Sequence, residues 1–462
     1  MSASDLTADV MAQFRNAGVD AHTTLLLGAG ASTTSGLPDW DELATRLLVS
    51  SGAVSNEESA RTLVSRQDPM MVVESARALH GPSWNKKLRA ALYEGVLSPE
   101  SSPLHLAAVA HALGGSPGDT TLVTLNFDTL LEDALQEETG APVESVADGR
   151  DVTDMAVHHL HGVVSTSATT EAVLTLTEFL DLMSDPDSWQ LRNLRAAVGR
   201  GAVVIAGTSY RDPDVRQWMH DAMRGAPDSH ATLILLARQG LAVTKQEFED
   251  LRSALTEQWS AIGMRPVLVN DFSDAAQVIR ELRFIDAPHY RAPQERAEAV
   301  WTYHALNFAR LQEEYVAELA QNAQTLSDAF SVDSMNLTLW LANSEGKLAR
   351  WAAQDRRYLD PNGLRMVETG FDSPWIAGQS LGSDTLLHKD LPEGDIRRWS
   401  SVLAVPIPVT HPEFPTVTSA VVTIGLPDRA ETYAGSRFLW ADAVSKIGDA
   451  WTSRISDAVF PR

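Results

Sequence analysis

Short apolar runs without polar alternation recur along the first part of the chain, and each leads into a polar loop and then a helical segment. The runs include residues 24–27, 121–125 and 202–206, followed by ATLILLA and RPVLV further along. An unbroken apolar strand is typical of a sheet covered on both faces, and strands separated by helices favour parallel pairing. The pattern therefore predicts an α/β fold with a Rossmann-like parallel sheet. Ligands are expected at the carboxyl ends of its strands.

The loop after the first strand is much longer and more polar than a turn requires. Residues 24–41 read TLLLGAGASTTSGLPDWD. Glycines at a strand-to-helix turn let backbone N–H groups approach a pyrophosphate, although two glycines alone are common in such turns. The whole stretch predicts a site for a phosphate-bearing ligand. Its candidate binding residues are Gly28, Ala29, Gly30, Ala31, Ser32, Pro38, Asp39 and Trp40.

Two further loops carry groups suited to ribose contacts or proton transfer. In TLNFD, residues 124–128, the Asn126 amide can both donate and accept hydrogen bonds, although Asn and Asp are also common helix N-caps. In AVHHLHG, the imidazole of His161 has an unperturbed pKa that suits a general base near neutral pH. No cysteine or carboxylate stands at metal-ligand spacing from these histidines, so His158 and His159 are interpreted as packing residues.

Taken in order, these motifs resemble the cofactor-binding loops of sirtuins over roughly residues 15–285. The resemblance rests on GAGASTTSGLPDW, on TLNFD, on the pair His161–Gly162, and on the loop that begins Gly207-Thr208-Ser209. It implies that NAD binds here, with the backbone N–H groups of Gly28–Ser32 at the pyrophosphate. It also implies contacts farther along the cofactor, made by Gly207, Thr208 and Ser209 at the phosphates and ribose and by Asn270 and Asp271 near the adenine.

The resemblance implies catalytic roles for three residues. Asn126 is expected to position water or ribose hydroxyls, His161 to act as the base, and Asp128 to hold the loop of Asn126. Sirtuin deacylases carry a Gln where this chain has Leu125, and they carry a four-cysteine zinc module, whereas this chain has no cysteine. The chain is therefore more similar to the NAD-hydrolysing sirtuin-like effectors of prokaryotic anti-phage systems, such as Thoeris and short-Argonaute-associated enzymes.

This comparison predicts an NAD glycohydrolase that takes NAD as its substrate and needs no zinc or other metal. Two other functions stay open. An NAD-dependent protein deacylase would need a peptide groove beside a zinc module. A catalytically silent sensor of NAD or ADP-ribose would have no need of the pair Asn126 and His161.

The sequence pattern changes after about residue 285. Residues 286–332 contain the linker APHYRAP and one long helical pattern, in which Trp301, Phe308 and Tyr315 recur every seven residues. Such a seam suits a coiled coil or ordinary packing on a neighbouring helix. Residues 333–462 have an α+β pattern, which includes a hairpin expected around Ser344–Gly346.

The segment RRWSSVLAVPIPV and the following strand SAVVTIGL resemble a GAF-type sensor domain. We therefore expect a sirtuin-like catalytic domain at 1–285, a helical linker at 286–332 and a GAF-like regulatory domain at 333–462. GAF-like domains flanked by apolar helices commonly associate through them. This predicts a homo-oligomer whose activity is set by a small-molecule activator or by a partner protein of a defence system.

Bulk composition restricts the function further. A chain of 462 residues is long enough for two or three domains, and its net charge of −24 argues against nonspecific nucleic-acid binding. No run approaches the ~18 apolar residues of a membrane helix. The N-terminal segment lacks the basic head and apolar stretch of a signal peptide. We expect a cytoplasmic protein that binds neither membrane nor nucleic acid directly.

Overall fold

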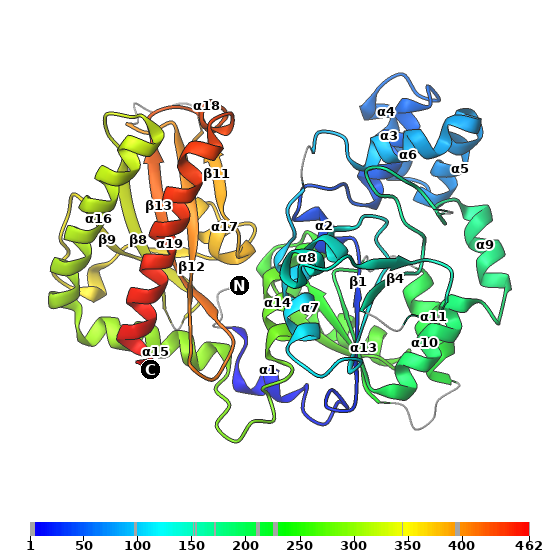
Figure 1. Ribbon diagram of the computed structural model, residues 1–462, viewed down its shortest axis with the longest axis horizontal. Coiled ribbons are helices and arrows are strands. Elements are labelled where there is room, and N and C mark those ends of the chain that lie inside the picture. The colour runs from blue at the N-terminus through cyan, green and yellow to red at the C-terminus, as the bar shows by residue number, and fades with distance from the viewer. Residues whose placement is uncertain are drawn as a thin grey trace. The chain divides into compact units, whose positions relative to one another are not determined.

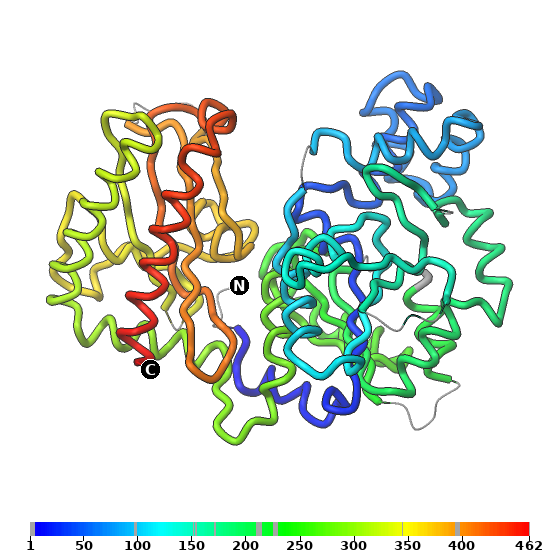
Figure 2. Tube along the Cα trace, in the orientation of Figure 1, coloured from blue at the N-terminus to red at the C-terminus, as the bar shows by residue number. Residues whose placement is uncertain are grey.

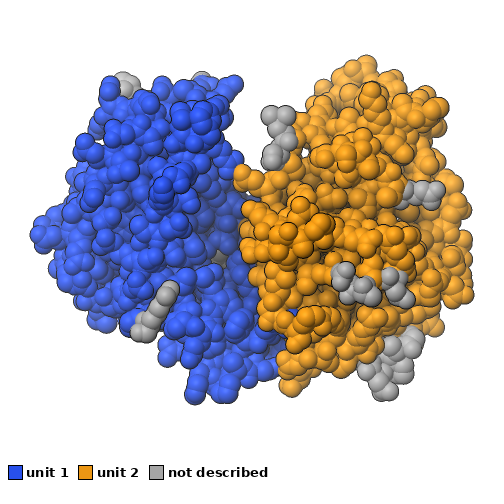
Figure 3. All heavy atoms as spheres, in the orientation of Figure 1, with its two compact units in different colours: residues 1–15, 269–462 blue, residues 16–268 orange. Residues whose placement is uncertain are grey.

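The computed structural model describes residues 5–96, 99–150, 152, 155–170, 172–208, 213–224, 230–343, 345–392 and 398–461. Contacts divide the chain into two compact units (Figure 3). Unit 2 is Asn16–Leu268, and unit 1 combines Met1–Arg15 with Val269–Arg462. Among the described residues, no helix is both long and apolar enough to cross a bilayer.

Unit 2 is built on a seven-stranded sheet with the order β3-β4-β2-β1-β5-β6-β7 (Figure 1). The strands are β1 Thr23–Leu27, β2 Thr120–Thr124, β3 Glu144–Val146, β4 Ala156–His159, β5 Ala202–Ala206, β6 Thr232–Ala237 and β7 Arg265–Val269. The pairs of β1 with β2 and β5 are parallel, as are those of β4 with β2 and β3. Every residue of β1, β5 and β6 is buried. The predicted Rossmann-like α/β sheet is confirmed.

Helices cover both faces of this sheet. One apolar cluster joins α10, α11 and α13 to β1, β2, β5 and β6, and α7 packs on β2 and α8. The helices of unit 2 outside the segment between β1 and α7 are α7 Pro103–Leu113, α8 Leu130–Thr139, α9 Leu176–Ser184, α10 Trp189–Arg200, α11 Pro213–Arg224, α12 Arg238–Leu241 and α13 Lys245–Ser260. Successive side chains of a strand point to opposite faces of the sheet. In β4, His158 therefore lies on the face covered by α10 and His159 on the face covered by α8.

A helical layer is inserted between β1 and α7 (Figure 1). After the short α2 Gly30–Thr33, which contacts α7, the layer contains α3 Trp40–Ser50, α4 Glu57–Val64, α5 Pro69–His80, a 3-10 turn at Gly81–Ser83, and α6 Trp84–Leu92. The layer has its own apolar core, which includes Leu47, Val73 and Leu88. Val164 and Leu174 belong to the same core, so the layer packs on the segment that follows β4.

Unit 1 contains a six-stranded antiparallel sheet with the order β10-β9-β8-β13-β12-β11. Its strands are β8 Asn336–Ala342, β9 Lys347–Ala353, β10 Met366–Glu368, β11 Leu387–Asp390, β12 Ser401–Val409 and β13 Val417–Leu426. β8 and β9 pair as expected for a hairpin, while Ser344 of its turn lies outside the described residues. An α+β unit is therefore confirmed for the C-terminal part of the chain.

The helices of unit 1 lie on both faces of its sheet. α16 packs on β8, β9 and α19, which lies alongside it in Figure 2, and α17 packs on β12 and β13. These helices are α1 Ala8–Ala12, α14 Phe272–Glu281, α15 Pro293–Leu306, α16 Phe308–Phe330, α17 Ile376–Ser383, α18 Ala430–Ala434 and α19 Arg437–Val459, with a 3-10 turn at Pro361–Gly363.

The long helical pattern of residues 293–330 forms two helices rather than one. They meet at Asn307, whose backbone leaves the helical conformation at φ −105° and ψ 20°. Its backbone N keeps the helical hydrogen bond to Tyr303 O at 3.1 Å, while its side-chain Nδ2 donates to the same carbonyl at 2.9 Å. Competition of an Asn side chain for backbone acceptors explains the break.

Candidate functional site

The loops that follow three neighbouring strands of unit 2 line one cavity. β4, β2 and β1 lie side by side and run parallel, so their carboxyl ends meet at one edge of the sheet. The cavity measures about 80 Å³. It is lined by Ala29, Ser32, Leu37, Pro38, Asp39, Trp40, Leu43, Met70, Leu92, Leu125, Asn126, Phe127, Asp128, His161 and Val173. The structure thus brings Asn126, Asp128 and His161 together with much of the first loop.

Glycines allow the loop after β1 and the loop after β5 to approach each other closely. Gly28 N donates to Ala206 O at 3.0 Å, and Gly30 N donates to Gly207 O at 2.6 Å. A Cβ atom on Gly28 would lie 2.5 Å from Thr208 Cα, and Gly207 has a φ of +69°, which favours glycine. Several expected binding residues are used in this junction and do not line the cavity, namely Gly28, Gly30, Ala31, Gly207 and Thr208.

Most backbone N–H groups of the first loop already have acceptors inside the protein. Besides the two glycine contacts, Ala31 N donates to Gly28 O at 2.9 Å and Ser32 N donates to Ala29 O at 3.0 Å. Of residues 28–32, as the described structure stands, only Ala29 has a backbone N–H without a protein acceptor, and Ala29 lines the cavity. The loop therefore offers one N–H to a ligand, where the sequence predicts several.

Asn126 is held in a single orientation by its neighbours. Its Nδ2 donates to Gly28 O at 3.1 Å and to Ser32 Oγ at 2.8 Å, and its backbone N donates to Thr124 Oγ1 at 3.0 Å. A carbonyl oxygen only accepts hydrogen bonds, so the atom that faces Gly28 O has to be the amide nitrogen. The amide oxygen, which takes no hydrogen bond from the described residues, is the group that Asn126 presents to a ligand.

Asp128 lies beside Asn126 and is linked to it through Ser32. The Ser32 hydroxyl accepts from Asn126 and bonds to the Asp128 carboxyl, which also accepts from Leu130 N at 3.2 Å. Burial raises the pKa of Asp128, against the opposing effect of these hydrogen bonds. Asp128 is thus an acceptor that fixes Ser32, and through Ser32 the amide of Asn126.

A buried pair of His159 and Glu132 holds the backbone of Asn126 in place. His159 is fully buried, with Nδ1 2.9 Å from Asn126 O and Nε2 2.6 Å from Glu132 Oε1. Burial lowers the pKa of His159, but the Glu132 carboxylate and the two hydrogen bonds raise it above the usual value overall. Both acceptors face ring nitrogens, so the arrangement suits an imidazolium that donates from both sides.

His161 stands in a row of aromatic side chains at the cavity. Its ring centroid lies 6.3 Å from that of Phe127 and 5.6 Å from that of Trp218, and Phe127 in turn lies 6.4 Å from Trp40. His161 is half-buried, and its carbonyl accepts from Val173 N at 2.9 Å. The imidazole is therefore held by ring packing while it lines the same cavity as Asn126.

The remaining expected binding residues lie elsewhere. Ser209 lies outside the described residues. Asn270 and Asp271 belong to unit 1, where Asn270 Nδ2 donates to Asp5 at 2.7 Å and Asp271 Oδ1 accepts from Phe371 N at 2.9 Å. Neither residue lines the cavity. Their contact with the adenine stays a prediction.

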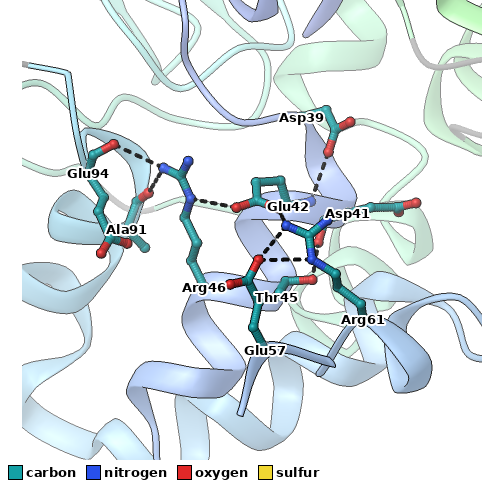
Figure 4. A network of polar contacts seen from close by, with 9 residues as sticks. All are labelled: Asp39, Asp41, Glu42, Thr45, Arg46, Glu57, Arg61, Ala91 and Glu94. Atoms are coloured by element: carbon teal, nitrogen blue, oxygen red, sulfur yellow. Dashed lines mark hydrogen bonds and ion pairs between the residues drawn. The ribbon is translucent and has the colours of Figure 1, made fainter. Parts of the chain in front are cut away.

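The helical layer that covers the cavity is tied together by two arginines (Figure 4). Glu42 of α3 accepts from Arg46 at 3.0 Å and from Arg61 of α4 at 2.9 Å. Arg46 also donates to Ala91 O of α6 at 3.0 Å. Asp39, which lines the cavity, caps α3 by accepting from Glu42 N at 2.8 Å. The wall of the cavity is thereby connected to α4 and α6.

Sequence reasoning missed the His159–Glu132 pair. The two residues are 27 positions apart, and only the pairing of β4 beside β2 brings His159 over α8. A usable signal was present, since His159 and Glu132 both stand close to residues already singled out. No group of three or more potential metal ligands occurs among the described residues, and independence from zinc stays a prediction.

Comparison with known proteins agrees with this geometry in part. Residues 120–266 match the family model described as SIR2-like domain, which spans about a third of the chain. The match begins at β2, so it covers Asn126, His161 and Gly207 but not the first loop. It confirms the predicted similarity to sirtuins for this segment and indicates an NAD-related enzymatic role.

The other comparisons add little. No curated protein sequence matches the chain. Among solved structures, the chain is similar to a crystal structure described as a GAF sensor protein from Burkholderia vietnamiensis, at 13% identity and a TM-score of 0.22. That likeness covers 36% of this chain and 94% of the other. At this TM-score it supports no conclusion, and the GAF-like character of unit 1 stays a prediction.

Proposed function

We propose that unit 2 hydrolyses NAD at the bond between nicotinamide and ribose. The observation that carries the proposal is the fixed amide of Asn126, whose oxygen is directed to a cavity that His161 also lines. The SIR2-like match supports NAD as the substrate. Water adds to the ribose carbon, nicotinamide leaves with the bonding electrons, and one proton is released.

The residues of the cavity suit a reaction that passes through an oxocarbenium-like state. Nicotinamide is neutral after it leaves, so the chain needs no acid for that step. The Asn126 amide oxygen accepts a hydrogen bond from the attacking water or from a ribose hydroxyl. His161 accepts the proton, and the apolar side chains of Leu37, Leu125 and Phe127 exclude other water.

We propose that the pyrophosphate of NAD is contacted by fewer backbone N–H groups than a glycine-rich loop usually provides. The N–H of Ala29 is the one backbone donor of residues 28–32 that is free among the described residues. It therefore makes the nearest backbone contact to the pyrophosphate.

The small size of the cavity is consistent with an enzyme that rests in an inactive state. Pockets for small ligands usually measure roughly 300–1,000 Å³, whereas this cavity measures about 80 Å³. NAD entry therefore requires movement of the covering segment, residues 37–43. We propose that a signal received by unit 1, or by a partner protein, controls this opening. Loss of cytosolic NAD would then serve an anti-phage response.

Nicotinamide release from NAD by the full chain tests the proposal. Asn126→Ala and His161→Ala should each reduce the rate at least about a hundredfold, because each removes a group that acts on the reacting atoms. Asn126→Asp, which keeps an oxygen but loses the donor to Gly28, should also be impaired. Arg195→Gln serves as a control, because Arg195 of α10 does not line the cavity, and this variant should have normal activity. Equal activity in all variants would contradict the assignment.

Two controls separate this function from the alternatives. Addition of an acetylated peptide should leave nicotinamide release unchanged, whereas a strict peptide requirement would indicate a deacylase. Binding of NAD with no turnover under any activating condition would indicate a silent sensor.

A further inference from the structure

Unit 2 contains a second and larger cavity that the proposed reaction does not use. It measures about 540 Å³, within the roughly 300–1,000 Å³ typical of small-molecule pockets. It lies between α10 and the α10-facing side of β1, β2 and β4, whereas the first cavity lies at the carboxyl ends of these strands. The two cavities share no lining residue.

The described lining of this cavity is cationic, although the chain as a whole has a net charge of −24. Arg192 and Arg200 stand eight residues apart on α10, which places them on one face of the helix. Arg150 adds a third guanidinium, and it is already paired with Glu144. No carboxylate occurs among the described lining residues.

Arg200 pairs with no carboxylate of the described residues. Within the described residues it makes neither an ion pair nor a hydrogen bond, whereas Arg192 donates to the carbonyl of Asp187. The pKa of His158 is lowered by burial, by His159 and, to a smaller extent, by the charge of Arg200. The charge of Arg200 therefore acts on a side chain of β4. A guanidinium without a partner beside a cavity is available to an anion.

Two buried polar atoms of the lining also lack partners. Thr24 is fully buried, and its hydroxyl has no hydrogen-bond partner in the described structure. His158 Nδ1 is likewise buried without a partner among the described residues. A buried polar group without a hydrogen-bond partner destabilises a protein. Two such groups in one lining favour a polar ligand at this cavity, independently of the arginines.

We propose that this cavity binds a small phosphate-bearing molecule. Guanidinium groups match phosphate oxygens and carry charge-assisted hydrogen bonds to them. The Thr24 hydroxyl can donate to a phosphate oxygen, and the ring of Trp189, which also lines the cavity, offers a flat apolar face to the rest of the molecule. The shared chemistry is a phosphate group, either free or as an ester of nucleotide size.

Calorimetric titration of the full chain with inorganic phosphate and with AMP tests the proposal. Arg200→Gln should weaken binding of the phosphate group about tenfold, the loss expected for one charge-assisted hydrogen bond. Arg195→Gln removes the same charge from the same helix, but Arg195 does not line the cavity. It should leave binding unchanged. Tighter binding of AMP than of phosphate would identify an ester ligand, and equal binding would identify free phosphate.

Thr24→Val provides a signature that a purely structural role would not produce. The change keeps the shape of the side chain and removes an unpaired buried hydroxyl, so the free protein should be as stable as the parent or more stable. The same variant should bind phosphate or AMP several times more weakly. A variant that is destabilised and binds normally would overturn the role of Thr24.

Asn126→Ala shows which cavity is titrated, because Asn126 lines only the first one. Binding that persists in this variant and is lost in Arg200→Gln supports the second cavity. The proposal is wrong if neither probe binds, if Arg195→Gln weakens binding as much as Arg200→Gln, or if Asn126→Ala abolishes it.

Discussion

His159 shows how a residue that never touches the candidate ligand site can govern it. One ring nitrogen contacts the carbonyl of Asn126 and the other contacts the carboxylate of Glu132, at 2.9 and 2.6 Å. The peptide of Asn126 is therefore held from behind while its amide is held by Gly28 and Ser32. A buried pair of this kind is costly to disturb, because removal of one partner leaves an unpaired charge.

Glu132→Gln should destabilise the protein in a pH-dependent way. The pKa of His159 is raised above 6.5, so the pair contributes stability that is complete below pH 6.5 and lost as pH rises through the raised pKa. We expect a loss of about 3 kcal/mol in the free energy of unfolding near ~pH 6, and a smaller loss near ~pH 9. Chemical denaturation at several pH values measures this.

The matched control is Ser145→Ala, because the Ser145 hydroxyl donates to the same carboxylate without touching Asn126 or His159. Its loss of stability should be smaller and nearly independent of pH. If the Glu132→Gln loss were equally independent of pH, His159 would not be charged in the folded protein.

At the scale of elements, the two arginines of the covering helices differ in how firmly they are held. Arg46 is 21% exposed and donates to the Ala91 carbonyl as well as to Glu42, whereas Arg61 is 58% exposed and pairs with two carboxylates. Exposed ion pairs contribute about 0–1 kcal/mol, whereas a lost donor to a buried carbonyl costs roughly 1–3 kcal/mol.

Arg46→Ala should therefore lower the free energy of unfolding by about 2 kcal/mol, whereas Arg61→Ala should lower it much less, because solvent screens the exposed Arg61 pairs. High salt should reduce the effect of Arg61→Ala further. Thermal unfolding at low and high salt checks the ranking. A larger effect of Arg61→Ala than of Arg46→Ala would mean that α4, rather than α6, holds the cover in place.

The strands and loops of unit 2 could be predicted from sequence because their signals are local. Unbroken apolar runs indicate buried parallel strands. The glycine pattern predicts an approach to a pyrophosphate, whereas Gly28 and Gly207 let two loops of the protein approach each other. The hydrogen bonding of the first loop could not be predicted in this way. Its N–H groups donate to carbonyls of the α2 turn and to Ala206 and Gly207 at the end of β5, and both sets of contacts depend on the tertiary fold. The break at Asn307 depends on a side-chain cap that competes with a continuous helical pattern.

At the scale of the whole molecule, the aromatic seam of residues 301–315 packs within unit 1. Phe308 contacts Trp351 of β9, and Tyr315 contacts Trp451 of α19, each with ring centroids 5.0 Å apart. A seam that is buried in its own unit is not available to a second copy. The large apolar residues of α19 that stay exposed are Phe438 and Leu439, at 78% and 56%.

We predict that a homo-oligomer, if it forms through α19, uses Phe438 and Leu439. Adjacent exposed apolar side chains favour association because burying them removes apolar surface from water. A double change to serine in the full chain should give a monomer by light scattering. It should also reduce nicotinamide release, since we predict that association sets the activity. Point variants are preferable to truncation near residue 290, because that cut would pass through unit 1.

Leu359→Ser is the matched control, because Leu359 is 95% exposed in the same unit but does not belong to α19. It should change neither the mass in solution nor the activity. A parent protein that is monomeric and fully active would show that activity does not depend on association. A double variant that stays oligomeric would place the interface elsewhere. If the double variant is monomeric but releases nicotinamide at the parent rate, association and control of the first cavity are separate properties of the chain, and the coupling between them would have to be abandoned.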